Sequence, residues 1–145
     1  MNKLYLVQTD TTVGFLSSDD KKLSRVKQRP ENQKVLQEVD SCKRLKSLTR
    51  IPKKFKKQIR RSKKTTFIYP NGQSYRIIDK NNMHFNFIKK FGVIYSTSAN
   101  KTKESFSLEY AHEKADIFVL TKEKFSETTG SKIFKTSNHT IKKIR

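Results

Sequence analysis

Three short polar segments carry the side chains best suited to chemistry, each beside a predicted strand or helix end. They are "QTDTTVGF" (8–15), "KQRP" (27–30) and "STSAN" (96–100). The first and third supply hydroxyl and amide groups, and the second supplies two cations, Lys27 and Arg29. Such groups bind phosphates and carboxylates and offset developing negative charge. The alternative for each segment is structural, because hydroxyl-rich turns usually satisfy backbone groups and a lone Lys-x-Arg is usually solvated.

The sequence lacks the motifs of nucleotide-binding loops, metal sites and catalytic nucleophiles. Four Gly form no Gly-x-Gly-x-x-Gly or Walker-type loop. Cys42 is the only cysteine, and His84, His112 and His139 lack ligand spacing, so we expect no disulfide and no protein-held metal. No spacing suggests a Ser-His-Asp or Cys-His nucleophile. Any chemistry would therefore rely on binding and electrostatics.

Positive charge is the strongest feature of the composition. The chain has 33 Lys and Arg against 13 Asp and Glu, a formal net charge of +20. This excess indicates a polyanionic or phosphate-bearing partner, with a coding bias towards Lys as the alternative. Between Ser41 and Ile78 there are 13 basic and no acidic residues, which a uniform bias would not produce. Phe55 and Ile59 place an apolar stripe under a basic helical face, so 41–78 predicts either a tRNA- or RNA-facing surface or a solvated helix.

Strand-like runs are spread along the whole chain. We predict strands in 3–8, 65–69, 74–78, 93–95, 116–120, 132–136 and 139–145, with 9–20 as a polar loop. The clearest local signal is the hairpin around Asn71-Gly72, which tolerates positive φ. These runs alternate with helices, but the embedded hairpin argues against a purely parallel sheet.

Capping residues mark the helices between those strands. Asp19 or Asp20 begins a helix before "KQRP", Ser41 begins the next, and Pro52 opens a basic helix. Asn81 or Asn82 would cap a further helix that Gly92 ends, and 107–115 forms the last. The length of 145 residues predicts one domain, 1–145, of the α+β (α/β) class with a mixed sheet covered by helices. With no leader and no membrane-length apolar run, we expect a cytoplasmic protein without a membrane partner.

The ordered set of motifs resembles the YrdC/TsaC family of threonylcarbamoyl-AMP synthases. "TDTTVGF" resembles the family's Pro-Thr-Asp-Thr-x-Tyr-Gly-Leu, "KQRP" its Lys-x-Arg-Pro, and "STSAN" its Ser-Thr-Ser-Ala-Asn residue for residue. "TTFIY", "SYRII", "GSKIF" and the final "KKIR" are similar to its later elements. The resemblance spans Leu4 to Arg145 and implies a YrdC-like three-layer fold with a twisted, mixed parallel and antiparallel sheet.

The resemblance implies an ATP-dependent nucleotidyltransferase. Family members condense L-threonine, bicarbonate and ATP, with Mg²⁺, into L-threonylcarbamoyladenylate and pyrophosphate. The threonylcarbamoyl-transferase machinery then uses the adenylate in tRNA processing, to make N6-threonylcarbamoyladenosine. Carried over by position, Lys27 and Arg29 are the catalytic cations on the triphosphate. Nucleotide-binding residues would be Lys27, Arg29, Ser96, Ser98, Asn100 and Arg145; threonine-binding residues would be Thr9, Thr11, Arg76 and Ser131, with Thr66 supporting the pocket.

Several positions depart from the family pattern. Gln8, Val13 and Phe15 stand where the family has Pro, Tyr and Leu, and Lys101–Lys103 replace its Leu-Ser-Gly. "RSKK" (61–64) replaces a Trp-Pro-Gly-Pro segment. These departures leave two interpretations: a compact enzyme, or a non-catalytic protein of the same fold that binds tRNA, rRNA or double-stranded RNA through its basic region.

Overall fold

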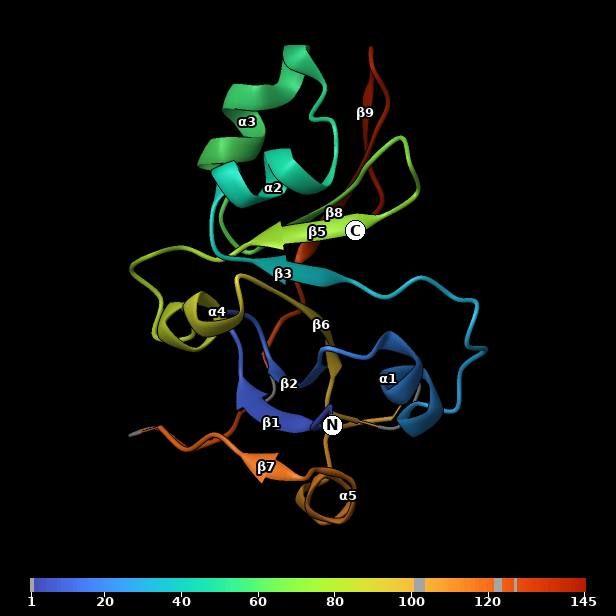
Figure 1. Cartoon of the computed structure of the whole chain (residues 1–145), viewed down its shortest axis with the longest axis vertical. Coiled ribbons are helices and arrows are strands. Elements are labelled where there is room, and N and C mark those ends of the chain that lie inside the picture. The colour runs from blue at the N-terminus through green and yellow to red at the C-terminus, as the bar shows by residue number, and fades with distance from the viewer. Residues whose placement is uncertain (1, 101–103, 122–123, 127) are drawn as a thin grey trace.

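Nine strands form one mixed sheet in the order β7-β1-β2-β6-β3-β5-β4-β8-β9 over the described residues of this computed structural model, 2–100, 104–121, 124–126 and 128–145 (Figure 1). The strands are β1 (Tyr5–Gln8), β2 (Val13–Ser17), β3 (Gln37–Val39), β4 (Thr65–Ile68), β5 (Ser74–Ile77), β6 (Val93–Ser98), β7 (Ile117–Phe118), β8 (Lys132–Thr136) and β9 (Ile141–Lys143). The β1–β7, β3–β5 and β4–β8 pairs are parallel, and the other five are antiparallel. The predicted mixed sheet is therefore confirmed.

Helices pack on both faces of this sheet. They are α1 (Asp20–Val26), α2 (Cys42–Leu48), the 3-10 turn η1 (Lys53–Phe55), α3 (Lys56–Arg61), α4 (Phe85–Phe91) and α5 (Leu108–Lys114). Side chains alternate along β1: Leu6 packs in one apolar cluster with Leu23 of α1, and Val7 packs in another with Ile88 of α4. The sheet thus lies between helical layers, as the three-layer fold requires.

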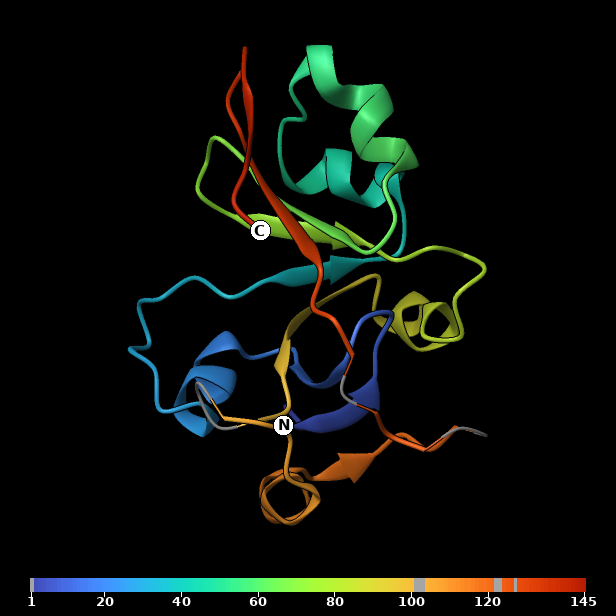
Figure 2. The ribbon, with the colours of Figure 1, turned by 180° about the vertical axis from the view of Figure 1, so that it is seen from behind.

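The helices α2 and α3 form a separate layer at one end of the molecule, over β3, β5 and β4 (Figures 1 and 2). Their inward side chains, Leu45 and Ile59, pack in a third cluster with Val39 and Phe67 of the sheet. The strand β9 lies beside them, and Lys54 Nζ of η1 donates to the carbonyl of His139 in the β8–β9 turn at 3.4 Å.

Most local signals in the sequence are confirmed. The hairpin pairs Phe67 with Tyr75, and Gly72 in its turn has φ 81°. Ser41 Oγ accepts a hydrogen bond from the Arg44 amide at 3.1 Å and so caps α2. At the end of α4, Gly92 has φ 77°, the left-handed region that favours glycine.

Two predictions are wrong. The segment 9–20 is not one polar loop, because Val13–Ser17 forms β2, whose five residues are all buried between β1 and β6. Gly14 permits this packing, since a Cβ there would lie 3.0 Å from the carbonyl oxygen of Thr97. Neither Asn81 nor Asn82 caps α4: the helix begins after His84, and Asn82 Oδ1 accepts from the His84 amide at 2.9 Å in the preceding turn.

The strands β3 and β6 also differ from the sequence expectation. The polar residues after Tyr95 continue β6 through Ser98, because they pair with β2, Gly14 opposite Ser98. The three-residue β3 has no sequence signal, yet it lies between β6 and β5. None of the helices in the described part of the chain is long and apolar enough to cross a membrane.

Candidate functional site

A cavity of about 280 Å³, lined mainly by polar residues, lies where seven separate segments meet. The β1–β2 turn, the segment from Arg29 to Leu36, the strands β4, β5 and β6, and the segment around β8 with the C-terminal residue all contribute to its wall. It contains eight of the ten predicted site residues: Thr9, Thr11, Arg29, Arg76, Ser96, Ser98, Ser131 and Arg145. Segments far apart in the sequence therefore share one site.

The cavity is cationic and rich in hydroxyl groups. Its four lining residues with charged side chains are Arg29, Lys34, Arg76 and Arg145, and the described lining includes no Asp or Glu. Lys34 carried no signal in the sequence, since it belongs to none of the motifs. A cavity with this lining suits an anionic ligand such as a phosphate or carboxylate.

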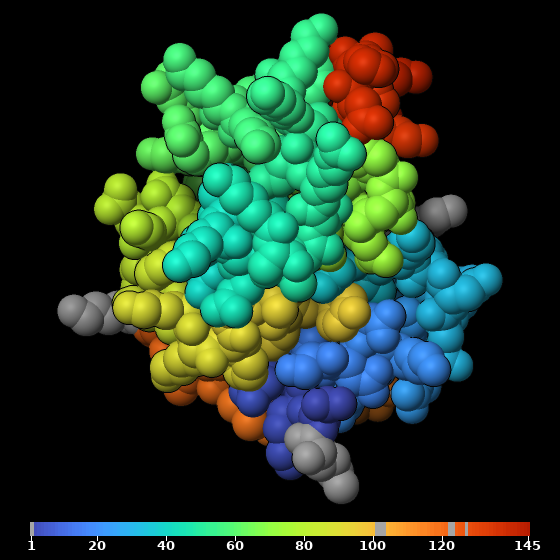
Figure 3. Space-filling view, turned by 45° about the horizontal axis from the view of Figure 1, so that its top comes forward, coloured from blue at the N-terminus to red at the C-terminus, as the bar shows by residue number. Residues whose placement is uncertain are grey.

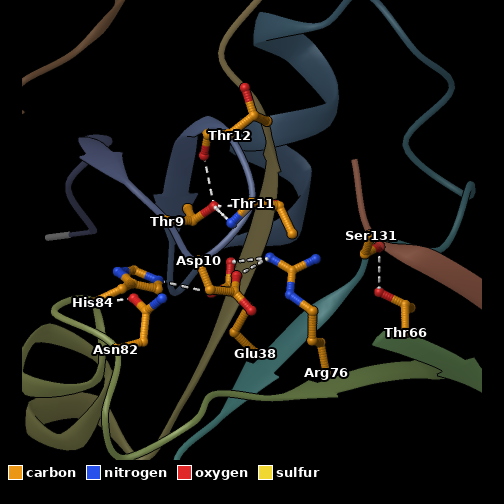
Figure 4. A network of polar contacts seen from close by, with 10 residues as sticks. All are labelled: Thr9, Asp10, Thr11, Thr12, Glu38, Thr66, Arg76, Asn82, His84 and Ser131. Carbon is orange, nitrogen blue, oxygen red and sulfur yellow. Dashed lines mark hydrogen bonds and ion pairs between the residues drawn. The ribbon is translucent and has the colours of Figure 1, made fainter. Parts of the chain in front are cut away.

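Several of the hydroxyls already have protein partners. Thr9 Oγ1 donates to the Thr12 carbonyl and accepts from the Thr11 amide at 3.2 Å, so it shapes the β1–β2 turn (Figure 4). Thr66 Oγ1 lies 2.8 Å from Ser131 Oγ, and this contact joins β4 to the segment before β8. Arg145 Nε donates to the Ser131 carbonyl at 3.0 Å.

Lys27 and Asn100 lie beside the cavity and do not line it. Lys27 is 2% exposed, and its Nζ donates to the Ser98 carbonyl at 3.0 Å, to Asn100 Oδ1 at 3.1 Å and to the Asn100 carbonyl. Asn100 lines an adjoining cavity of about 170 Å³, and Ser98 lines both. Lys27 thus holds the "STSAN" segment in place. Burial, and then the charge of Arg29, lower the pKa of Lys27 to about 8.

The end of α1 explains why Lys27 and Arg29 separate. Gln28 has φ 56°, and the amides of Gln28 and Arg29 donate to the carbonyls of Arg25 and Ser24. This is a Schellman ending with a left-handed residue after the C-cap. It turns the chain sharply, so Lys27 points to β6 while Arg29 reaches the cavity.

Behind the cavity lies a buried cluster of four ionisable side chains (Figure 4). Arg76 Nη2 lies 3.0 Å from Asp10 Oδ1 and 3.4 Å from Glu38 Oε2, and His84 Nε2 lies 2.7 Å from Glu38 Oε1. Glu38 and Arg76 are opposite each other in the parallel β3–β5 register. The two acids therefore hold one edge of the Arg76 guanidinium in place, while Arg76 also lines the cavity.

The pKa values of the two carboxyl groups in this cluster, those of Asp10 and Glu38, shift in opposite directions. Burial would raise the pKa of Glu38, but the charges of Arg76 and His84, with hydrogen bonds from His84 and Ser96, lower it to about 2. Burial raises the pKa of Asp10, and Arg76 offsets this only in part. Sequence reasoning did not assign roles to Asp10, Glu38 or His84.

The departures at Gln8 and Val13 lie at the start and end of the β1–β2 turn, where the two residues pair with each other. The departure at Lys101–Lys103 lies outside the described residues. Among the residues that the structure does describe, no group of three or more His, Cys, Asp or Glu side chains gathers as a metal site would require.

Comparison with solved structures identifies similar folds. P. abyssi Sua5 complexed with L-threonine has a TM-score of 0.78 and 18% identity, and the alignment covers 99% of this chain and 50% of that one. MTH1692 from Methanobacterium thermoautotrophicum has a TM-score of 0.72 and 17% identity, with 99% and 79% covered. Full-length HypF in a phosphate- and nucleotide-bound form has a TM-score of 0.73 and 15% identity, and the alignment covers 99% of this chain and 26% of that one.

The chain has the Sua5/YrdC-type fold. It spans about half the length of the Sua5 chain and a quarter of HypF. No protein-family model matches the sequence. No curated protein matches it either. At these low identities the structural likeness establishes the fold alone.

Proposed function

We propose that the chain is an L-threonylcarbamoyladenylate synthase that uses L-threonine, bicarbonate and ATP. The observation that carries this proposal is that eight of the ten predicted site residues line one cavity. Further support comes from the solved Sua5 structure with L-threonine and the HypF structure with nucleotide, which share the fold.

The proposed reaction has two bond-forming steps. The threonine amine and bicarbonate give a carbamate and water, and a carbamate oxygen then attacks the α-phosphorus of ATP. The bond from the α-phosphorus to the bridging oxygen breaks, and pyrophosphate leaves with the electron pair. Because no covalent intermediate is required, the protein's task is to align anions and offset charge on the phosphates.

Each part of the cavity has a proposed role in this reaction. Arg29 contacts the triphosphate directly, and Lys27 acts from beside it by holding Ser98 and Asn100 against the nucleotide. Arg145 closes the nucleotide end, and Ser96 lines the cavity there beside Ser98. The free edge of Arg76 faces the threonine carboxylate.

The threonine end is built from hydroxyl groups. Thr9 and Thr11 border the amine and carbamate, and Ser131, held by Thr66, lies opposite them in the cavity wall. Mg²⁺ would enter as the ATP complex, held by phosphate oxygens and water, because the described lining offers hydroxyls and no Asp or Glu side chain.

A pyrophosphate assay tests the proposal. Purified protein is supplied with ATP, Mg²⁺, bicarbonate and L-threonine, and release is compared with a mixture that lacks threonine. We expect release that depends on threonine and on bicarbonate. No release at all would favour the non-catalytic alternative, and release that is independent of both threonine and bicarbonate would contradict the proposed reaction.

A further inference from the structure

The four cations that line the cavity differ in burial and in partners. Arg76 is 4% exposed, Arg29 is half-buried, and Lys34 and Arg145 are exposed. Arg76 therefore lies at the floor of the cavity, and the other three cations lie nearer to its mouth. Within the described part of the chain, Arg76 has two acidic partners, whereas none of the three cations at the mouth forms an ion pair. Positive charge is thus available at the mouth and largely cancelled at the floor.

The floor carries no net positive charge. Asp10 and Glu38 lie 3.0 and 3.4 Å from the same nitrogen of Arg76, Nη2. Both acids are buried and neither lines the cavity, so they act on a ligand only through the charge of Arg76. The pKa of Glu38, lowered to about 2, keeps this acid ionised at neutral pH. Two carboxylates therefore face one guanidinium, and a charged His84 beside Glu38 would bring the sum only to zero.

The guanidinium of Arg76 still offers a directed contact to a ligand. Its other terminal nitrogen, Nη1, points towards Ser131 and away from the two acids (Figure 4). A ligand carboxylate can accept a hydrogen bond there, but it becomes the third carboxylate around one buried guanidinium. Crowding of like charges in a desolvated site is costly unless the ligand brings a positive charge of its own.

This requirement separates two kinds of ligand. A zwitterionic amino acid meets it, because its ammonium group offsets its carboxylate, and the hydroxyl oxygens of Thr9 and Thr11 in the wall can face that ammonium. A phosphate group does not meet it, because it carries about two negative charges near neutral pH and no positive one. Phosphate groups are better held by the three cations at the mouth.

We propose that Asp10 and Glu38 are specificity-determining residues: by cancelling the charge of Arg76, they make the floor of the cavity select a zwitterionic amino acid and leave phosphate groups to the mouth. The inference rests on the proposed function, which places the threonine carboxylate at Arg76. It adds the reason why a cavity lined by four cations can hold an amino acid and a triphosphate in separate places.

Wild-type protein tests this selection directly. Burial raises the pKa of Asp10, so binding is measured by calorimetry at about pH 8 to keep this acid ionised. The probes are L-threonine, sulfate as a stand-in for a phosphate group, and (R)-3-hydroxybutyrate, which is L-threonine without its amino group. Chloride at equal ionic strength is the control for sulfate.

We expect sulfate to change the Kd of L-threonine less than about twofold, and (R)-3-hydroxybutyrate to bind at least about tenfold more weakly than L-threonine. Sulfate that displaces threonine from the wild-type protein, or equal binding of the two organic ligands, would overturn the proposal. These measurements are decisive even if no variant folds.

A variant then tests the acids themselves. Asp10→Asn removes one negative charge with little change of shape, and Glu113→Gln, on an exposed side chain of α5, loses the same charge as a matched control. In Asp10→Asn we expect saturating sulfate to raise the apparent Kd of L-threonine about tenfold, and the preference for L-threonine over (R)-3-hydroxybutyrate to shrink. Glu113→Gln should match wild type. Equal weakening of all three ligands in Asp10→Asn would indicate a merely structural role and would overturn the proposal.

Sulfate binding without threonine separates this proposal from the proposed function. Because the floor gains a positive charge in Asp10→Asn, this variant should bind one more sulfate than Glu113→Gln does. Equal numbers of bound sulfate would overturn the charge division between floor and mouth. Wild-type protein that binds no L-threonine would contradict the proposed function, and the comparison of bound sulfate would still test the charge division.

Discussion

The cavity and the basic layer, residues 41–64, both carry excess positive charge, but they hold it in opposite ways. The basic layer contains α2, η1 and α3, has 12 Lys and Arg and no Asp or Glu, and covers one end of the molecule (Figure 3). In the cavity, Arg76 is buried and its guanidinium is fixed by Asp10 and Glu38. In the layer of α2, η1 and α3, Lys57 and Arg61 are exposed. Among the described residues, neither of them forms an ion pair. A fixed, desolvated cation selects a ligand by geometry, whereas a solvated face attracts any polyanion in a salt-dependent manner. The first arrangement suits chemistry and the second suits docking.

The largest expected effect is on stability, when a charge of the buried cluster is removed. Glu38→Gln removes a fully buried charge that contacts both Arg76 and His84. We expect the free energy of unfolding at pH 7 to fall by about 3–5 kcal/mol, the usual cost of breaking a buried ion pair. Glu113→Gln is the control, because Glu113 is exposed and its nearest ion pair, with Lys114, spans 3.8 Å. Denaturant titration measures both, and equal losses would contradict the role of Glu38.

The Glu38 effect should also depend on pH in a definite direction. The pKa of Glu38 is about 2 in the folded protein against an ordinary value of 4.5. Since folding weakens its proton binding, the carboxylate stabilises the fold fully above pH 4.5, and this contribution is lost as the pH falls towards 2. The stability difference between wild type and Glu38→Gln should therefore shrink across that interval.

The second effect concerns turnover. Arg29→Ala removes a cation that lines the cavity, and we expect threonine-dependent pyrophosphate release to fall about 10- to 1000-fold, the range for loss of one preorganised charge. Arg25→Ala is the matched control, because Arg25 is on the last turn of α1, is exposed and pairs only loosely with Glu31 at 3.5 Å. Unchanged turnover in Arg29→Ala would remove this residue from the site.

The third effect is a pH dependence of nucleotide binding. With its pKa lowered to about 8, Lys27 is charged below that pH and neutral above it. We expect ATP affinity to decline as the pH rises from 7 to 9. In Lys27→Arg the side chain stays charged, so the decline should disappear. Calorimetric titrations at several pH values measure this, and a decline that persists in Lys27→Arg would implicate another group.

The smallest effect should be on the stability of a variant of the basic layer. Lys57→Gln/Arg61→Gln changes two exposed side chains on α3, and we expect the free energy of unfolding to stay within about 0.5 kcal/mol of wild type. A much larger loss, seen in thermal or denaturant unfolding, would show that these cations support the fold.

Local signals in the sequence predicted much of the fold. The Asn71-Gly72 turn, the Ser41 cap and the Gly92 stop depend on neighbouring residues alone, and all three are confirmed. The strand β2 was missed because Gly14 interrupts its apolar residues and polar residues flank it. Its burial depends on β1 and β6, which are distant contacts that no local pattern reports.

In the candidate site, too, the features that depend on local sequence were predictable and those that depend on distant contacts were not. The motifs come from separate segments, and eight of the ten site residues predicted from them line one cavity. The cluster behind it was not predictable, because Glu38 reaches Arg76 through the β3–β5 register and His84 through the position of α4. Lys34 reaches the cavity only because the chain folds back between α1 and β3.

One experiment tests most directly whether the cavity, and not the basic layer, carries the proposed reaction. Threonine-dependent pyrophosphate release, without RNA, is measured for wild type, Arg29→Ala and Lys57→Gln/Arg61→Gln side by side. Equal rates for wild type and the basic-layer variant, with a rate at least about tenfold lower for Arg29→Ala, are the predicted result. Wild-type release that does not depend on threonine, or a basic-layer variant as impaired as Arg29→Ala, would contradict it.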